Sequence, residues 1–407
     1  MKTLFLTPQD TLFFRDGRPM EGALAGHTAA WCPPHVVNYA FHAALHRAGL
    51  DSHKHHSGIS KNRDYSSERN QSFGSLLTVG PFPVDAKGNW YFPAPADLAK
   101  DNGTVKIAML PMKSENQSSL PEPLTHSLAS VLPPAKDSAP GNWLRADAWG
   151  KYLRGENLRP DDFIADSDFG DFEASIGIGI NPETGTQDGE SFYSAHYLRL
   201  KDDWRLGVDV SANDKEFGDL IEKLLPEERL IVVGGQQRIC TIKEAEKAMP
   251  FPQMDMELSE CCCVKWVLLS PAVFPEIGGH RGGWLPNWID AKSGEVMLKQ
   301  SVERKRPGES RVDWRARVET AGSIDAKLIA AKIGNPVPIS GWKLQTGSAK
   351  PTQLSVPAGS VYYFQCGTPE AAKQLARVLN YPNRRSTLWG EKGYGIGICS
   401  SFNLKQN

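Results

Sequence analysis

The chain has 407 residues, of which 40% are hydrophobic and 23% are charged, and this is enough to bury the cores of two domains. Its 46 Lys and Arg nearly balance 47 Asp and Glu, so the net charge of −1 excludes a protein drawn to nucleic acid by its overall field. Any RNA site must then be a local basic patch. No apolar run approaches the ~18 residues of a membrane helix, which predicts a cytoplasmic protein without a membrane partner.

The seven cysteines do not follow a disulfide or zinc-site pattern. Three of them are consecutive, at positions 261–263, and lead into an apolar strand-like run. No Cys-x-x-Cys pair occurs, and the tract His53, His55 and His56 lies in a polar stretch that offers no fixed ligand geometry. We therefore interpret the cysteines as small core residues and predict no metal and no cofactor.

The first half of the chain is predicted to begin with a strand, a loop and a helix. The strand ends at Pro8, and the following turn carries two Phe and two Arg. After Pro33 and Pro34, apolar residues recur at helical spacing up to Gly49. Three further segments are predicted as a polar flexible insertion over 51–72, extended chain over 74–100, and a Pro- and Ser-rich surface loop over 111–142.

A β-hairpin is predicted next, because the turn residues 181–185 separate two apolar stretches that end at Ile180 and Leu200. A helix over 214–226 then leads to a strand over 229–233. The Pro- and Met-rich segment 249–256 marks the predicted boundary between domains 1–255 and 256–407.

The second half is predicted to repeat this mixture of strands and helices. Because strands often follow strands directly, the pattern favours an antiparallel α+β fold over a doubly wound parallel sheet. We predict two tandem ferredoxin-like (RRM-like) domains with loop insertions. The predicted elements are strands at 261–269, 325–333, 359–365 and 396–402, a Gly- and Trp-rich loop at 277–288, and a helix at 368–380.

The glycine-rich loop Gly393-Tyr394-Gly395-Ile396-Gly397 superficially suggests a dinucleotide site. That motif requires a following helix and an acidic residue about 20 positions later, and the sequence ends at Asn407. The loop instead offers unhindered backbone amides and the ammonium of Lys392 to a phosphodiester backbone. If its side chains alternate as in a strand, Tyr394 and Ile396 face one side and the glycines leave the other side bare. A tight turn into the last strand is the alternative explanation.

No catalytic residue is predicted from the sequence. Phosphate-binding, zinc-protease and serine-hydrolase motifs are absent. Cys32 and His35 lie three positions apart, but the prolines between them favour an extended backbone and no third group is identified that would orient the pair.

Several segments together resemble the RAMP superfamily of CRISPR proteins, and within it the family of the third subunit of Cmr, or type III-B, effector complexes. The similarity covers nearly the whole chain. No single matching segment is specific for this family, but the segments together are. It rests on residues 10–19, 176–199, 234–238, 268–286, 341–351 and 356–364, and on the terminal glycine loop.

This resemblance implies a pair of ferredoxin-like domains that hold the 5′ handle of the CRISPR RNA (crRNA) without catalysing a reaction. The implied protein partners are the large polymerase-like Cmr subunit and neighbouring backbone RAMP subunits. Sheets of this kind bind single-stranded RNA by stacking bases on aromatic rings and by contacts from Arg to phosphate. The RNA-binding residues expected here are Phe14, Arg15, Gly17, Arg18, Arg199, Arg238, Lys392, Gly393, Tyr394 and Gly395, with at least one of Phe13 and Phe14 in the core.

The sequence departs from the family pattern at two places. Residues 38–42 stand where the first helix commonly carries Gly-Ala-Leu-Arg, and Gln236-Gln237 precedes Arg238 where an acidic residue is common. Two alternative hypotheses stay open: a structural spacer that contacts only protein, and a RAMP-type endoribonuclease that processes the repeat transcript. The endoribonuclease is the one that makes a chemical prediction. It would use His27, His35 or His42 as the general acid or base.

Overall fold

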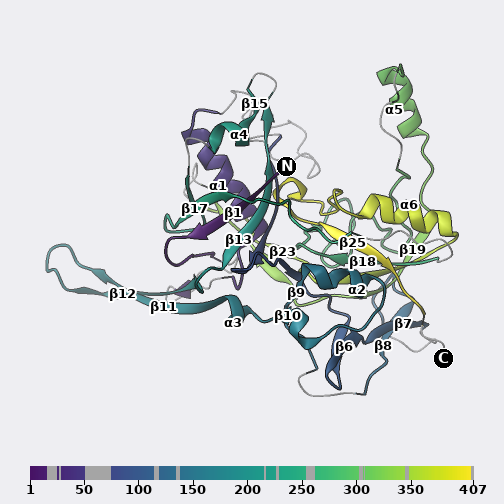
Figure 1. Ribbon diagram of the computed structural model, residues 1–407, viewed down its shortest axis with the longest axis horizontal. Helices are drawn as coiled ribbons and strands as arrows, with labels where there is room; N and C mark the ends of the chain where they lie inside the picture. The colour runs from purple at the N-terminus through teal and green to yellow at the C-terminus, as the bar shows by residue number, and fades with distance from the viewer. Residues whose placement is uncertain are drawn as a thin grey trace.

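A computed structural model of the chain shows many antiparallel strands, few helices and one long projecting hairpin (Figure 1). The predicted antiparallel mixture of strands and helices is confirmed. Within the part of the chain that it describes, no helix has the length and apolar character to cross a bilayer. The described residues are 1–15, 25–26, 29–50, 75–113, 119–133, 138–214, 217–225, 229–253, 262–301, 306, 308–343 and 348–404.

The first half is built on a five-stranded sheet with the order β16-β17-β1-β13-β3, and all its neighbouring strands are antiparallel. Leu4 and Leu6 of β1 point toward helix α1, whereas Phe5 packs on the opposite face. Both faces of this sheet are therefore covered. The elements are β1 (Lys2–Pro8), α1 (Pro34–Arg47), β3 (Leu77–Val84), β13 (Arg205–Ser211), α4 (Leu220–Leu224), β16 (Leu230–Val232) and β17 (Ile239–Glu244).

Helix α1 begins where the sequence predicts. Proline is favoured in the first helical turn because its missing N–H would have no partner there. The helix buries Val37, Phe41, Ala44 and Leu45 against the sheet at helical spacing.

The second half is built on a four-stranded sheet with the order β19-β24-β18-β25, again antiparallel throughout. Helix α6 covers one face, and its first turn is capped by Thr368, whose hydroxyl accepts the N–H of Ala371 at 3.1 Å. Its predicted position is confirmed, as are those of all four strands. These elements are β18 (Cys263–Leu268), β19 (Ala326–Lys332), β24 (Val361–Cys366), α6 (Pro369–Leu379) and β25 (Gly397–Ser401).

A large insertion follows β3. The predicted surface loop over 111–142 is wrong in part, because β7 and β8 pair as a hairpin with Pro111 opposite Leu128. Proline is tolerated where its lost N–H is not needed by a neighbouring strand. The insertion contains β4 (Tyr91–Pro93), β5 (Leu98–Asp101), β6 (Thr104–Ile107), β7 (Met109–Lys113), β8 (His126–Ser130), β9 (Trp143–Arg145), η2 (Ala146–Ala148), α2 (Trp149–Leu153), η3 (Pro160–Asp162), β10 (Phe163–Ile164) and α3 (Asp166–Phe169).

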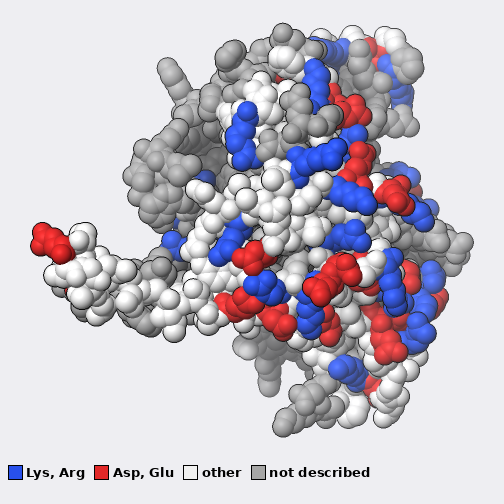
Figure 2. Space-filling view, turned by 60° about the vertical axis from the view of Figure 1, so that its left-hand side comes forward, with Lys and Arg blue, Asp and Glu red and all other residues white. Residues whose placement is uncertain are grey.

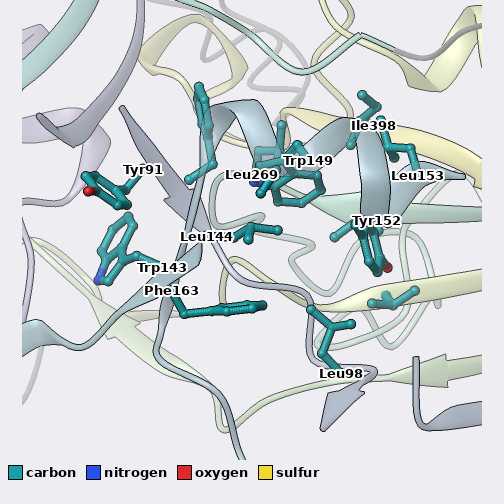
Figure 3. Close-up of a cluster of buried hydrophobic side chains, with 14 of the residues drawn as sticks. Tyr91, Leu98, Trp143, Leu144, Trp149, Tyr152, Leu153, Phe163, Leu269 and Ile398 are labelled. Atoms are coloured by element: carbon teal, nitrogen blue, oxygen red, sulfur yellow. The ribbon is translucent and has the colours of Figure 1, made fainter. Parts of the chain in front are cut away.

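The insertion shares one hydrophobic core with both sheets (Figure 3). Tyr91 and Trp149 of the insertion lie in the same cluster as Leu269 and Ile398 of the second half. The domain boundary near residue 255 stays a prediction, but one hydrophobic core is continuous across the two halves. We therefore expect the two halves to unfold together.

A buried ion pair joins the insertion to the second sheet. Lys265 Nζ lies 2.9 Å from Asp97 Oδ2, and the two side chains are 1% and 0% exposed. Tyr152 and Tyr363 donate their hydroxyls to the same carboxylate, at 2.9 and 3.3 Å. Burial lowers the pKa of Lys265, and the neighbouring Asp97 opposes this effect.

The predicted hairpin is confirmed, as β11 (Gly170–Ile180) and β12 (Gln187–Leu200), and it projects from the body (Figures 1 and 2). The isoleucines Ile176, Ile178 and Ile180 are 68%, 50% and 64% exposed. Residues 174–198 include no Lys or Arg. In Figure 2, Lys and Arg intermingle with Asp and Glu over the body, while acidic side chains lie at the hairpin tip.

The helix predicted over 214–226 is shorter than expected. The short antiparallel pair β14–β15 lies in its first part, and Asp219 caps the five-residue helix α4 by accepting the N–H of Ile221. Helix α5 was not predicted, and the insertion predicted at 51–72 lies outside the described residues. The remaining elements are β2 (Ala25–Gly26), β14 (Asn213–Asp214), β15 (Gly218–Asp219), α5 (Arg311–Glu319), β20 (Val337–Ile339), β21 (Trp342–Lys343), β22 (Ser348–Ala349), β23 (Gln353–Ser355) and η4 (Gly390–Lys392).

Candidate RNA interface

The first loop places its aromatic residues inside the protein. Phe13 and Phe14 are 9% and 1% exposed, which confirms that at least one of them is a core residue. Phe14 offers no exposed ring face to a base, so the expectation that it stacks on RNA has no support in this geometry. Arg15 is exposed, whereas Gly17 and Arg18 lie outside the described residues.

Two of the predicted arginines meet at one carboxylate. Arg199 Nη2 lies 3.0 Å from Asp10 Oδ1, and Arg238 Nη1 lies 3.1 Å from Asp10 Oδ2. The Arg238 guanidinium also lies 4.7 Å from the centre of the Tyr197 ring. We call Asp10, Tyr197, Arg199 and Arg238 the Asp10 cluster.

A sharp turn between β16 and β17 positions Arg238. Gln236 and Gln237 both have positive φ, at 55° and 52°. A side chain at Gly235 would begin 2.7 Å from Phe13 Cδ1, so the Gly-Gly pair lets this turn pack on the first loop. Tyr197 donates its hydroxyl to the Gln236 amide oxygen, which links this turn to the Asp10 cluster.

The Asp10 cluster is electrostatically balanced. Arg199 also donates to Glu173, and this hydrogen bond, together with that to Asp10, raises the pKa of Arg199. Arg199 and Arg238 are 48% and 26% exposed, so a phosphate can approach both. It must compete with two carboxylates for them.

A cavity of about 570 Å³ lies between the two halves and receives residues from both. Its walls are mainly apolar and aromatic, and include Trp31, Trp143 and Pro338. Arg15 contributes a cation to the lining. Volume, apolar walls and few polar groups are typical of sites for small flat molecules, a class that includes a nucleobase.

Hydrogen bonds hold the aromatic walls of the cavity in place. Trp31 Nε1 donates to the Pro81 carbonyl at 2.8 Å, and Trp143 Nε1 donates to Asp166 at 2.7 Å. The polar edges of both rings are satisfied within the protein. The rings therefore present mainly their apolar surfaces to the cavity.

The terminal glycine loop is packed against the protein itself. A side chain at Gly395 would begin 2.0 Å from the Ser386 nitrogen, and one at Gly397 would begin 2.3 Å from Trp266 Nε1. Tyr394 is fully buried. The expectation of a bare glycine face opposite Tyr394 and Ile396 is therefore wrong, and the alternative of a tight turn fits the geometry.

The turn explains why alternation fails in this loop. Gly393 and Gly395 have φ values of 92° and 70°, so the backbone is left-handed there and its side chains do not alternate as in a strand. Contact between RNA and Gly393, Tyr394 or Gly395 stays a prediction. In this conformation the ring of Tyr394 is not accessible to it.

Lys392 belongs to a second group of charges, which the sequence did not predict. Lys392 Nζ and Lys350 Nζ lie 3.2 and 3.1 Å from the hydroxyl oxygen of Tyr39 on α1. Tyr39 is 38% exposed. Burial acts to raise the pKa of Tyr39, but the two ammonium groups outweigh it and the pKa is lowered. We call Tyr39, Lys350 and Lys392 the Tyr39 cluster.

His35 lies beside the Tyr39 cluster in a neutral state. Burial, and then the charges of Lys392 and Lys350, lower the pKa of His35 to about 3. Its Nδ1 is 2.6 Å from the Tyr394 hydroxyl. Cys32 contacts the Pro33 carbonyl rather than His35, and burial raises the pKa of its thiol well above the usual value. These two residues do not form a nucleophile–base pair.

Residues 4–399 match the family described as CRISPR-associated protein (Cas_Cmr3). The chain belongs to the Cas_Cmr3 family. The resemblance to the third subunit of type III-B effector complexes is thus confirmed, and membership in Cas_Cmr3 makes the chain a type III-B CRISPR effector subunit.

Solved structures similar to this Cas_Cmr3 chain come from CRISPR complexes. A chain of the type III-B Cmr-beta complex bound to cognate target RNA and AMPPnP is 14% identical, with 89% of this chain and 86% of that chain covered and a TM-score of 0.45. A chain of the Csm3-Csm4 subcomplex of the type III-A CRISPR-Cas interference complex is 10% identical, with 90% and 97% covered and a TM-score of 0.36. No curated protein sequence matches the chain.

Proposed function

We propose that this chain is the non-catalytic RNA-binding subunit of a type III-B effector and holds the 5′ handle of the crRNA. The observation that carries the proposal is the cavity of about 570 Å³ between the two halves, with aromatic walls and Arg15 in its lining. Single-stranded RNA is recognised through unstacked bases on apolar surfaces and phosphates on Arg or Lys. The cavity and the nearby cations supply both kinds of contact.

We infer that each sheet is a ferredoxin-like unit. In such a unit, strands numbered in chain order lie side by side as 4-1-3-2 with helices after the first and third strands. The order β17-β1-β13-β3, with α1 after β1 and α4 after β13, supports this for the first half. The order β25-β18-β24-β19, with α6 packed on the sheet after β24, supports it for the second half, whose other helix, α5, projects away from the sheet (Figure 1).

The contacts of His35 support a subunit without a catalytic role. A general acid or base works best with a pKa near the operating pH. The pKa of His35 is about 3, and its Nδ1 is engaged by Tyr394. Among the other histidines suggested for an endoribonuclease, His42 lies on α1 with its ring edge-on to His46, and His27 is outside the described residues.

The hairpin β11–β12 supports a protein partner along most of its length. Its exposed isoleucines provide apolar contact area, and residues 174–198 offer no cation to a phosphate backbone. We propose that this arm docks on a neighbouring backbone RAMP subunit. Another part of the body would then contact the large polymerase-like subunit.

Crosslinking of the assembled complex tests the proposal, with photoreactive bases placed through the crRNA handle. We expect crosslinks to residues that line the cavity, and a loss of crRNA affinity with Arg15→Glu of about 1 to 3 kcal/mol. Arg315→Glu, on the outlying helix α5, makes the same charge change and should leave affinity unchanged. Unchanged binding by Arg15→Glu, with no crosslinks at the cavity, would contradict the proposal.

A cleavage assay separates the proposal from the endoribonuclease hypothesis. The purified chain, alone or in the complex, should not cut repeat RNA in EDTA or in divalent metal. Specific cleavage that is abolished by His27→Ala, His35→Ala or His42→Ala would favour the nuclease.

A further inference from the structure

The Tyr39 cluster brings together three segments that are far apart in the chain. Tyr39 lies on α1, Lys350 precedes β23, and Lys392 lies in η4. Both ammonium groups approach one phenol oxygen, so their nitrogens lie within about 6 Å of each other. Each also lies over the Tyr39 ring, 4.9 and 4.8 Å from its centre.

Among the residues that the structure describes, the positive charge of this cluster is only partly balanced. Among the described residues, the carboxylate paired with the cluster is that of Glu391, at 3.7 Å from Lys392 Nζ. Two ammonium groups thus face one carboxylate and one neutral phenol. Repulsion between the lysines remains, and an anion bound between them would relieve it.

The loop that carries Lys392 is held in place by hydrogen bonds, and the cluster is partly exposed to solvent. Arg384 Nη1 donates to the carbonyls of Gly390 and Glu391, both at 3.1 Å, which braces the loop that carries Lys392. Tyr39 is 38% exposed and Lys350 is half-buried, whereas Lys392 is 7% exposed, so an anion would approach from the side of Tyr39 and Lys350. His35, beside Tyr39, is neutral and adds no charge, because its pKa is lowered to about 3.

The donors and their surroundings favour a phosphate. Two ammonium groups and the Tyr39 O–H provide separate donors, which suits a tetrahedral oxyanion with several acceptor oxygens. His35, which is half-buried, lies in the lining of the cavity between the halves. Ser340 also lines the cavity and donates its hydroxyl to the Lys350 carbonyl at 2.7 Å. The cluster therefore adjoins a space that can hold a base.

We propose that Tyr39, Lys350 and Lys392 form a phosphate site that binds one phosphodiester group of single-stranded RNA beside the cavity. The identification of RNA as the source of the phosphate rests on the proposed function. The site itself rests on two ammonium groups that share a single carboxylate. Tyr39 accepts a hydrogen bond from the lysines and donates its own proton to a phosphate oxygen.

The first experiment measures crRNA affinity of the full chain as a function of salt. Lys350→Gln should weaken crRNA binding about tenfold. The slope of log affinity against log salt concentration should become shallower by about 0.7, as expected for one lost phosphate contact on a single strand. Tyr39→Phe should weaken binding less and leave the slope unchanged, because it removes a hydrogen bond and no charge. Lys327→Gln, at an exposed position on β19, is the matched control and should bind as wild type.

The second experiment uses inorganic phosphate and the chain without RNA. Phosphate should raise the melting temperature of wild type and of Lys327→Gln, but not that of Lys350→Gln. If phosphate acts in this way while Lys350→Gln leaves crRNA binding unaffected, the phosphate site is supported. The proposal that the bound phosphate belongs to RNA is then wrong. If Lys350→Gln changes neither the phosphate response nor the salt slope, the site is overturned.

Discussion

Two clusters in this protein combine lysine with tyrosine, and they differ in charge balance and burial. Lys265 lies 4.1 Å from the Tyr152 ring centre, and Lys350 lies 4.9 Å from that of Tyr39. Lys265 is 1% exposed and is paired with Asp97. The Tyr39 cluster is partly open and holds an excess of positive charge. The same residue types thus stabilise the fold where the charge is neutralised, and prepare for a ligand where it is not.

Removal of a lysine from each cluster gives the largest expected contrast. Lys265→Met leaves Asp97 buried without its cation, and we expect the free energy of unfolding to fall by about 3 to 5 kcal/mol. Lys350→Met removes a partly exposed ammonium that has a neutral partner, and should cost less than about 1 kcal/mol. Urea unfolding of the two variants measures the difference.

A double variant provides the control for this contrast. Lys265→Met combined with Asp97→Asn removes both charges, and should recover a large part of the stability lost in Lys265→Met alone. Equal losses in Lys265→Met and Lys350→Met would show that charge balance does not separate the two clusters.

The pH dependence of stability provides a smaller effect per pH unit at His35, beside the Tyr39 cluster. The pKa of His35 is about 3 in the folded chain against an ordinary value of 6.5. Below pH 6.5 the unfolded chain therefore binds a proton that the folded chain does not. Stability should fall as the pH drops from about 6.5 toward about 3, by at most about 1.4 kcal/mol per pH unit.

The variant His35→Gln isolates this contribution. The difference in unfolding free energy between wild type and His35→Gln should diminish as the pH falls from 6.5 to 4, since other groups titrate equally in both. Inorganic phosphate should reduce the slope if an anion occupies the Tyr39 cluster, because it offsets the lysine charges that disfavour protonation of His35. A difference independent of pH would contradict the low pKa.

Local patterns in the sequence were sufficient for helices α1 and α6, the β11–β12 hairpin and the four strands of the second sheet, but strands β13 and β17 of the first sheet were not predicted. Helix α6 has a capping Thr368 and apolar residues at i, i+3 and i+4 spacing, and the β11–β12 hairpin has a turn between apolar stretches. The β7–β8 hairpin was missed because its Pro and Ser residues suggest a loop, and tertiary pairing outweighed that tendency.

The clusters could not be predicted in the same way. Lys265 and Asp97 are 168 positions apart, and Lys350 and Tyr39 are 311 apart, so no local spacing indicates either contact. The glycine loop was singled out correctly as unusual, but strand alternation was applied to a backbone with positive φ at Gly393 and Gly395. The glycines allow the positive φ angles of the turn, and the ammonium of Lys392 contacts the hydroxyl of Tyr39 on α1.

The Asp10 cluster is intermediate between these two cases and gives the smallest expected effect. It is exposed like the Tyr39 cluster, but Asp10 and Glu173 balance Arg199 and Arg238. A backbone hydrogen bond from Thr11, together with the two arginines, lowers the pKa of Asp10, which keeps it charged at neutral pH.

If the arginines bind RNA, this carboxylate competes with the phosphate, and Asp10→Asn should raise crRNA affinity a few-fold and steepen its salt dependence. Asn keeps the shape and the acceptor for Thr11, so the fold should be retained. Asp203→Asn, in an exposed turn at φ 66°, is the matched control. A loss of affinity in Asp10→Asn would mean that Asp10 orients the arginines toward RNA. Unchanged affinity would show that the Asp10 cluster is not part of the RNA interface, and the cavity and the Tyr39 cluster would then hold the crRNA.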